Sequence, residues 1–203
     1  MIREIIAFTI ASIAVALIPG PDTMVVLRAT VSGGRRDGFA TIAGVLTGLF
    51  AWITLTTAGV AVLFAASKVG YLILHIVGGL YLLYLGVTAI FSKSSPLTIK
   101  AEERPRSILA AFSKGMATDL LNPKVGIFFI SFLPSFIPKG ANVPLATLLY
   151  GIDFLIVSLA YLVVVVIGSQ ALINLLADRR KRRGVEVSTG AILSAFGVKI
   201  LLG

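Results

Sequence analysis

The amino-acid sequence predicts an all-α integral membrane protein, and three observations support this fold class. Of the 203 residues, 57% are hydrophobic and 13% are charged, and the mean hydropathy is +1.00. A soluble domain of this size needs more charge to cover its surface. Charged residues are also absent from three long stretches, 38–67, 69–92 and 154–177, and about 20 apolar residues are enough for a helix to cross the hydrocarbon core.

These stretches are apolar on all sides, whereas the strands of a membrane β-barrel alternate apolar and polar residues over segments of about ten. A helix also satisfies its own backbone hydrogen bonds in lipid. The sequence therefore predicts about six transmembrane helices, at residues 5–27, 38–63, 70–91, 113–136, 145–172 and 187–202.

The lysine and arginine residues lie mainly in alternate loops. Thirteen of the 18 are expected on one side: Arg28, Arg35, Arg36, Lys93, Lys100, Arg104, Arg106, Lys114, Arg179, Arg180, Lys181, Arg182 and Arg183. The other side has Arg3, Lys68, Lys139 and Lys199. The positive-inside rule makes the cation-rich side cytoplasmic. The chain is therefore predicted to cross the cell (inner) membrane several times, with both termini outside. The net charge of +9 is then explained by cations that orient the spans in the membrane. For this reason we expect no nucleic-acid partner.

The chain is predicted to be a single transmembrane domain, residues 1–203, built from two halves. A cytoplasmic linker at about residues 92–107 contains Ser, Pro, Lys and Glu and separates repeat 1 (about 1–91) from repeat 2 (about 108–203). Three spans per half mean that the second half enters the membrane from the opposite face. This arrangement predicts an inverted-topology repeat, as in many secondary transporters.

The first predicted span is interrupted by a Pro-Gly-Pro-Asp sequence. A proline clashes with the carbonyl four residues earlier and removes its hydrogen bond, so Pro19 frees the carbonyl of Val15 and Pro21 frees a second one. Gly20 allows a sharp bend between them. Asp22 is costly in a membrane unless it faces water or a partner. The alternative is that the span ends at Pro19 and that Asp22 is an exposed helix cap.

The fourth predicted span contains a second break at Asn122 and Pro123, with Asp119 before it and Lys124 after it. An unpaired lysine at mid-membrane depth is costly, and intramembrane charges commonly mark a transport pathway. The alternative is a structural ion pair between Lys124 and either Asp119 or Asp22. Because proline-interrupted spans open both halves, they predict a transporter site between spans one and four.

This site is expected to bind a small zwitterion. Lys124 and the N-termini of the broken helices would hold a carboxylate, while Asp22, Asp119 or Asp153 would hold an ammonium group or carry a coupling proton. Asn122 and the freed carbonyls would complete the shell. No metal site or cofactor is predicted.

Small residues Ala40, Gly44 and Gly48 recur every four positions, and Gly190 and Ser194 repeat this spacing later in the chain. Such stripes allow helices to approach closely, and we expect packing within the bundle. The sequence leaves the oligomeric state open, a homo-oligomer included.

Three other classes of function are alternatives to transport. A membrane enzyme needs a nucleophile–base or metal constellation, which a chain with no cysteine and one histidine, His75, does not suggest. A passive channel needs a ring of like charges or a continuous polar pore. A structural membrane subunit is a further alternative.

Four motifs are spread along the chain: Pro-Gly-Pro-Asp-Thr at 19–23, the segment 34–40, the glycine- and tyrosine-containing segment 78–86, and Asn-Pro-Lys at 122–124 within the segment 112–136. With these motifs the chain resembles the lysine-exporter superfamily, in particular its homoserine/threonine-efflux branch. The resemblance implies export of amino acids and related metabolites from the cytoplasm, driven by the proton gradient. Asp119 departs from the family pattern, which has a neutral polar residue such as Asn there.

Overall fold

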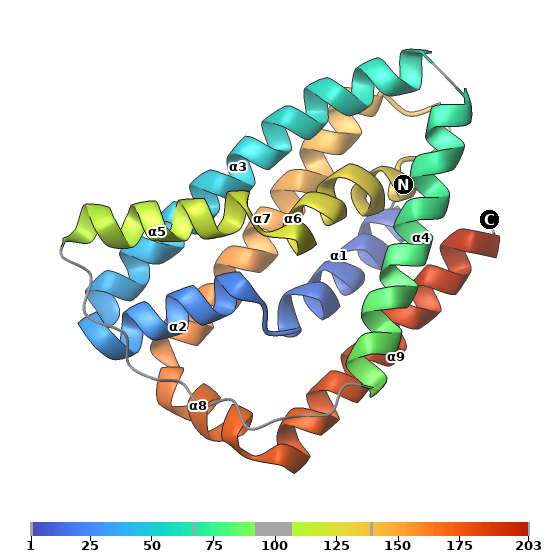
Figure 1. Ribbon diagram of the computed structural model, residues 1–203. Coiled ribbons are helices and arrows are strands. Elements are labelled where there is room, and N and C mark those ends of the chain that lie inside the picture. Colours follow the sequence, from blue (N-terminus) through green and yellow to red (C-terminus); the bar gives the residue numbers. More distant parts are fainter. Residues whose placement is uncertain (1, 67, 92–106, 139, 203) are drawn as a thin grey trace.

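The computed structural model describes residues 2–66, 68–91, 107–138 and 140–202, which form a helical bundle with no strand among them (Figure 1). The predicted linker at 92–107, except Ser107, and its four cations lie outside the described residues. In chain order the elements are α1 (Ile2–Leu17), α2 (Pro21–Gly33), α3 (Arg35–Ala66), α4 (Lys68–Phe91), α5 (Ile108–Leu120), α6 (Pro123–Ile127), the π-helix η1 (Phe128–Phe132), the 3₁₀-helix η2 (Leu133–Phe136), α7 (Val143–Ile167), α8 (Ser169–Ala177) and α9 (Arg179–Leu202).

Both predicted breaks are present as bends between consecutive helices. The axes of α1 and α2 differ by 53°, and those of α5 and the segment Pro123–Phe136 by 48°. Proline stands at the start of α2 and of α6, where its missing N–H costs nothing. Each half of the chain therefore begins with a bent pair, as the sequence predicted, and the inverted relation of the two halves stays a prediction.

By length and composition, three described helical segments can span a membrane: Arg35–Gly59 within α3, α7 and α9. The number rises to five if each bent pair is one span, and the described apolar part of α4, Ile76–Phe91, is shorter. The chain is thus a helical multi-span membrane protein, and six as the number of spans stays a prediction. The expected end of the fifth span at 172 is wrong, because α7 ends at Ile167 and Gly168 separates it from α8.

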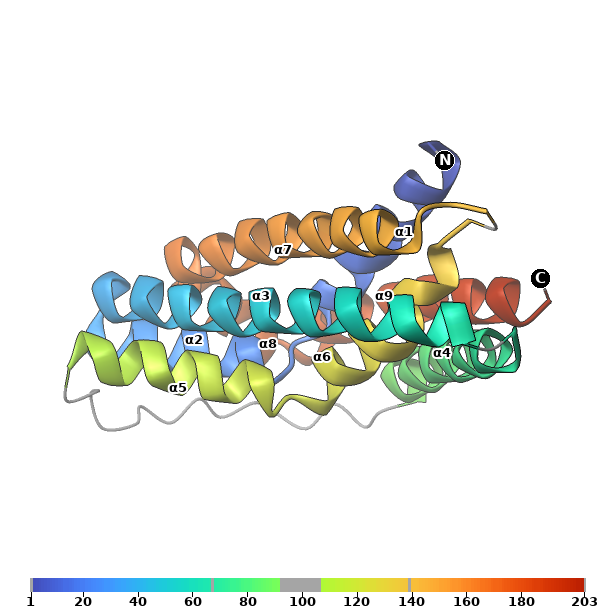
Figure 2. The same cartoon turned by 90° about the horizontal axis from the view of Figure 1, so that it is seen from above.

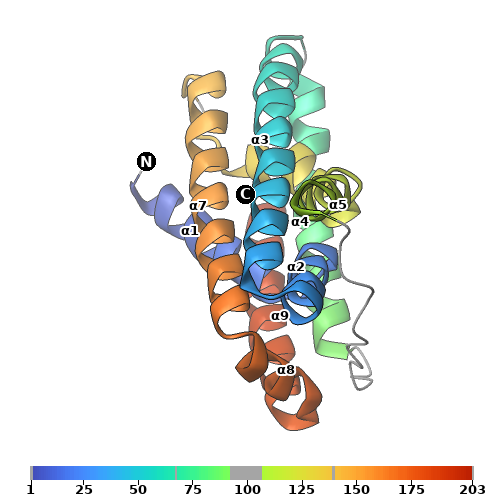
Figure 3. The same ribbon diagram turned by 90° about the vertical axis from the view of Figure 1, so that its left-hand side faces the viewer.

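α3 lies between α7 and α5 (Figures 2 and 3), and α4 packs along α9. α1 begins and α9 ends at the same end of the bundle, whereas the junction of α2 and α3 and the start of α5 lie at the opposite end (Figures 1 and 2). The arginines that begin α3 and the basic run that begins α9 are on the side away from the start of α1. This agrees with the predicted clustering of cations, and the end that faces the cytoplasm stays a prediction.

The small-residue stripes pack helices inside the bundle, as predicted. A Cβ added to Gly44 would clash with the backbone carbonyl of Phe112 in α5, and one added to Gly115 in α5 would clash with the carbonyl of Thr41 in α3. A Cβ added to Gly190 in α9 would lie 2.7 Å from the carbonyl oxygen of Gly86 in α4. These contacts hold α3 against α5 and α4 against α9.

Gly44→Ala is therefore expected to destabilise the protein by about 1–3 kcal/mol, because backbone atoms of α5 must move to admit the methyl group. Gly59→Ala is the matched control in the same helix, since its added Cβ would meet no atom within 4 Å. That variant should be neutral or slightly stabilising, because alanine favours helix more than glycine does. Thermal unfolding in detergent measures both, and equal melting temperatures would contradict the packing argument.

Candidate functional site

The two helix breaks meet near the middle of the bundle, away from both of its ends (Figure 1). α1 ends at Leu17 and α2 begins at Pro21, while α5 ends at Leu120 and α6 begins at Pro123. The Lys124 side chain passes beside the first break, and a Cβ added to Gly20 would lie 3.7 Å from its Cδ. Spans one and four therefore meet at their breaks, as the paired prolines predicted.

Lys124 binds the open end of α1. Its Nζ donates hydrogen bonds to the backbone oxygen of Val15 at 2.5 Å and to that of Ile18 at 2.9 Å. The Val15 carbonyl is the one that Pro19 was expected to free. The C-terminal end of a helix carries a partial negative charge that favours a cation. Lys124 makes no salt bridge with Asp22 or Asp119 within the described parts of the chain, so the structural ion pair that was the alternative to a binding role is not present there.

Asn122 connects the two breaks through its side chain. Its Oδ1 accepts a hydrogen bond from the backbone N–H of Lys124 at 3.0 Å, which caps α6, and its Nδ2 donates to Oδ2 of Asp22 at 2.7 Å. Asp22 stands in the first turn of α2, where the helix dipole stabilises a carboxylate. Oδ1 of Asp22 is buried and has no hydrogen-bond partner among the described residues.

Asp119 is fully buried beside α3, and neither of its carboxylate oxygens has a hydrogen-bond partner in the described structure. A Cβ added to Gly48 would clash with Oδ2 of Asp119, so the carboxyl group fills the space that this glycine leaves. Its backbone oxygen accepts from the N–H of Asn122 at 3.0 Å. Asp119 is therefore joined to the second break through the backbone, while its carboxyl group lies in the contact between α3 and α5.

A cavity lies where the two breaks meet, with about 480 Å³ of empty space that includes the open space at its mouth. Four predicted residues line it: Gly20, Asp22, Asn122 and Lys124. The other lining residues are Val15, Ala16, Thr23, Val45, Leu49, Val125, Phe128, Phe154, Ser158, Tyr161 and Leu162. The predicted site residues Pro19, Pro21, Pro123 and Asp119 do not line it; the prolines shape the breaks.

The wall opposite the breaks comes from α7. Tyr161 lines the cavity, and its hydroxyl lies 3.3 Å from Oγ1 of Thr23, at hydrogen-bonding distance. The predicted carboxylate Asp153 instead accepts a hydrogen bond from Oγ1 of Thr9 at 3.0 Å and does not line the cavity. Sequence reasoning missed Tyr161 and Ser158, because neither is charged and nothing local in the sequence signals which face of α7 meets the breaks.

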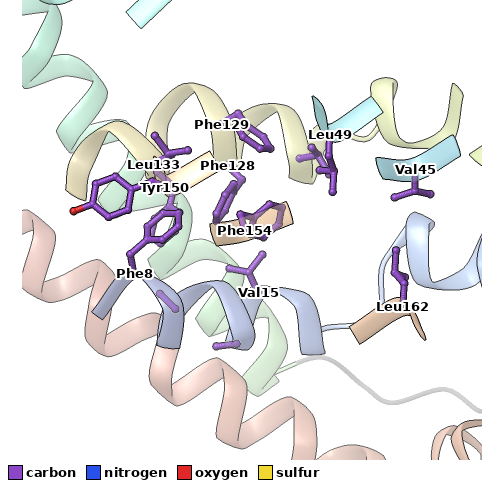
Figure 4. Packing of buried hydrophobic residues seen from close by; sticks show 14 of the residues in the cluster. Phe8, Val15, Val45, Leu49, Phe128, Phe129, Leu133, Tyr150, Phe154 and Leu162 are labelled. Carbon is purple, nitrogen blue, oxygen red and sulfur yellow. The ribbon is translucent and has the colours of Figure 1, made fainter. Parts of the chain in front are cut away.

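Buried aromatic rings pack together next to the cavity, with Phe128 and Phe154 side by side (Figure 4). Phe128 and Phe154 line it and stack with ring centroids 4.0 Å apart. Phe8 lies behind them, with its centroid 5.9 Å from that of Phe128 and 4.7 Å from that of Tyr150. Phe128 belongs to η1, and π-helical turns often occur at functional sites.

The cavity thus combines one ammonium group, one carboxylate, one amide and several hydroxyls with apolar walls. Such a set can bind a small molecule that carries both charges and an apolar part. Within the described residues, no group of three or more His, Cys, Asp or Glu side chains could hold a metal ion.

The chain matches the protein family described as LysE type translocator over residues 13–203. It is 29% identical to the uncharacterized membrane protein YrhP of Bacillus subtilis (strain 168) over 206 residues, which cover 97% of this chain and 98% of that protein. It is 28% identical to the leucine efflux protein of Salmonella typhimurium (strain LT2) over 195 residues, with 95% and 92% of the two chains covered.

A leucine efflux protein of Klebsiella pneumoniae is 24% identical over 177 residues, covering 87% of this chain and 84% of that one. No solved structure matches the chain. The family match covers both helix breaks and every predicted site residue. The chain therefore belongs to the LysE type translocator family, and it is a membrane transporter and not an enzyme.

Proposed function

We propose that this transporter exports amino acids with apolar side chains from the cytoplasm, and that the cavity between the helix breaks is its substrate site. One observation carries the proposal: Lys124, Asp22 and Asn122 meet at the two breaks, beside a wall of apolar side chains. The relatives named leucine efflux protein support an apolar amino acid as the substrate.

Each part of such a substrate has a counterpart in the cavity. The ammonium group would bind Asp22, whose Oδ1 has no partner among the described residues, and the carboxylate would bind Lys124. The substrate side chain would contact Val45, Leu49 and Leu162. A buried charge is costly unless it is paired, so a zwitterion with both charges paired is favoured over a simple cation or anion.

The contacts of Lys124 suggest how substrate binding could change the bend between α1 and α2. Its ammonium group now holds the carbonyls of Val15 and Ile18 at the end of α1, directly before the bend. A substrate carboxylate would compete for the same N–H donors and release these carbonyls. The bend between α1 and α2 could then change angle while the two halves rock around the site, as alternating access requires.

Proton coupling is assigned to Asp119, with Asp22 and Asp153 as the alternatives. A buried carboxylate without a partner is costly, and binding a proton removes the charge. Asp119 has no described partner for either oxygen and lies outside the cavity, so substrate and proton can bind at the same time. Its backbone bond to Asn122 would transmit a shift of α5 to the substrate site.

Replacing Asp22 is expected to abolish binding. Trp52 is the single tryptophan of the chain, and a Cβ added to Gly126 in α6 would lie 3.2 Å from its ring, so its fluorescence reports on the helix that carries Lys124. Leucine should change this fluorescence in a saturable way in the wild type and not in Asp22→Asn. Asp153→Asn is the matched control outside the cavity and should retain the response. A wild type that neither responds to leucine nor catalyses counterflow of amino acids would refute the proposed function.

Counterflow also separates this proposal from a passive channel. Labelled leucine should accumulate transiently in sealed vesicles preloaded with unlabelled leucine, because a carrier exchanges its substrates across the membrane. A channel would only equilibrate the label.

We propose that the protein lies in the inner membrane with both termini outside, because most of the cations lie in loops on one side of the predicted spans. Reporter fusions after residue 203 should be active only when the reporter works in the periplasm. Fusions within residues 93–106 should behave in the opposite way. A cytoplasmic C-terminus together with an outside N-terminus would mean an odd number of spans.

A further inference from the structure

A second cavity lies on the other side of the first helix break, and none of its described lining residues also lines the substrate cavity. Its empty space, together with the open space at its mouth, is about 600 Å³, and the described residues that line it are Ile18, Pro19, Leu85, Thr88, Ala89, Arg182 and Glu186. Ile18 and Pro19 face this cavity, whereas the next residue, Gly20, lines the substrate cavity. The bend after α1 is therefore the partition between the two spaces.

An ion pair of opposite charges lies in the wall of this second cavity. Nε of Arg182 donates to Oε1 of Glu186 at 2.8 Å, and the two side chains are only 15% and 11% exposed. A second pair of this region, Lys181 with Asp178, is 4.0 Å apart and far more exposed. Because burying two charges costs more than exposing them, this pair needs a reason to lie in a cavity and not in solvent.

The neighbouring arginine, Arg183, has a structural role that distinguishes it from Arg182. Its guanidinium group donates to the backbone oxygens of Ala89 and Ile90 in the last turn of α4, where a cation favours the helix end. The start of α9 is thus held against the end of α4 by Arg183, and Arg182 is directed to the cavity between α4, α9 and the first break.

We propose that this second cavity is an access site for the same zwitterionic substrates, which are held there before they pass the partition into the substrate cavity. The substrate carboxylate binds the Arg182 guanidinium and the substrate ammonium binds Glu186, so each charge of the substrate meets a side chain of opposite charge. The apolar side chains of Ile18, Leu85 and Ala89 accept the apolar part. This inference rests on the proposed function and on the predicted orientation, in which the start of α9 is cytoplasmic.

The position of the partition connects this access site to the Lys124 contact. The carbonyl oxygen of Ile18 binds Lys124 on the substrate side, while the same residue lines the access site on the other. When Lys124 releases the carbonyl oxygen of Ile18, this residue would be free to move, and the partition between the two cavities would open there. A substrate in the access site would be admitted only while Lys124 is free to receive its carboxylate.

The experiment compares Arg182→Gln and Glu186→Gln with the wild type in inside-out vesicles, which present the cytoplasmic face to added leucine. Each variant should raise the KM for leucine uptake about tenfold, as expected for a lost charged contact, with little change in the maximal rate. The dissociation constant at the substrate cavity, measured through Trp52 fluorescence, should stay unchanged, because an access site alters arrival and not equilibrium affinity. Arg180→Gln removes an equal charge from the same basic run and is the matched control, since Arg180 is exposed and does not line the cavity.

A charge-reversed pair separates this role from a structural one. Arg182→Glu combined with Glu186→Arg restores the i,i+4 attraction and should restore the melting temperature, while the KM stays high because the two charges are exchanged along the path. If the reversed pair restores the KM as well, or if neither single variant raises it, the inference is wrong. If the rise in KM appears only in vesicles containing phosphatidylethanolamine, a lipid headgroup occupies the cavity and the inference is also wrong. Failure of the wild type to bind leucine would instead count against the proposed function.

Discussion

Lys124→Met is expected to abolish leucine efflux and to lower the melting temperature. The variant loses the only described cation in the substrate cavity, so the substrate carboxylate has no partner there. It also leaves the carbonyls of Val15 and Ile18 without the N–H donors that they have now. Each buried carbonyl left unpaired costs about 1–3 kcal/mol.

The measurement combines efflux from preloaded cells with thermal unfolding in detergent. Lys199→Met is the matched control, because Lys199 is an exposed lysine near the end of α9 and does not line the substrate cavity. It should show normal efflux and stability. Lys124→Arg keeps the positive charge and several donors. Compared with Lys124→Met, its melting temperature should therefore recover more fully than its efflux rate. A stable Lys124→Met protein with full efflux would exclude both the binding role and the contact with the break.

Asp119→Asn is expected to uncouple transport from the proton gradient while leaving exchange intact. Asparagine has nearly the same shape as aspartate, so the contact with Gly48 should be retained. The fold should be as stable as the wild type or more stable, because a buried carboxylate without a described partner is removed. Substrate binding should persist, since Asp119 does not line the substrate cavity.

Vesicles with an imposed pH difference test this expectation. Wild-type vesicles should accumulate leucine against its gradient when the pH difference is applied, whereas Asp119→Asn should catalyse counterflow at all pH values and show no accumulation. Gly48→Ala offers a second test from the facing helix, because its methyl group must displace the Asp119 carboxyl group. Accumulation by Asp119→Asn equal to that of the wild type would transfer the coupling role to Asp22 or Asp153.

The sequence alone was enough for those features that depend on neighbours in the chain. Membrane insertion follows from charge-free stretches of sufficient length, and the two breaks follow from Pro19 and Pro123, because a proline acts on the carbonyl four residues before it. The free Val15 carbonyl was predicted on that ground, and the structure confirms that it accepts a bond from outside its helix. The interhelical role of Gly44 followed likewise from its four-residue spacing.

Only the tertiary structure decided which distant groups meet. Lys124 could have paired with an aspartate, yet it binds carbonyls more than a hundred positions away, while Asp22 is bound by Asn122. Asp119 and Asp153 are directed away from the cavity, and uncharged Tyr161 faces into it. The rotation of each helix about its axis determines these choices. That rotation is set by close contacts such as Gly44 against Phe112 and by the packing of all neighbouring helices at once, which no local pattern of residues encodes.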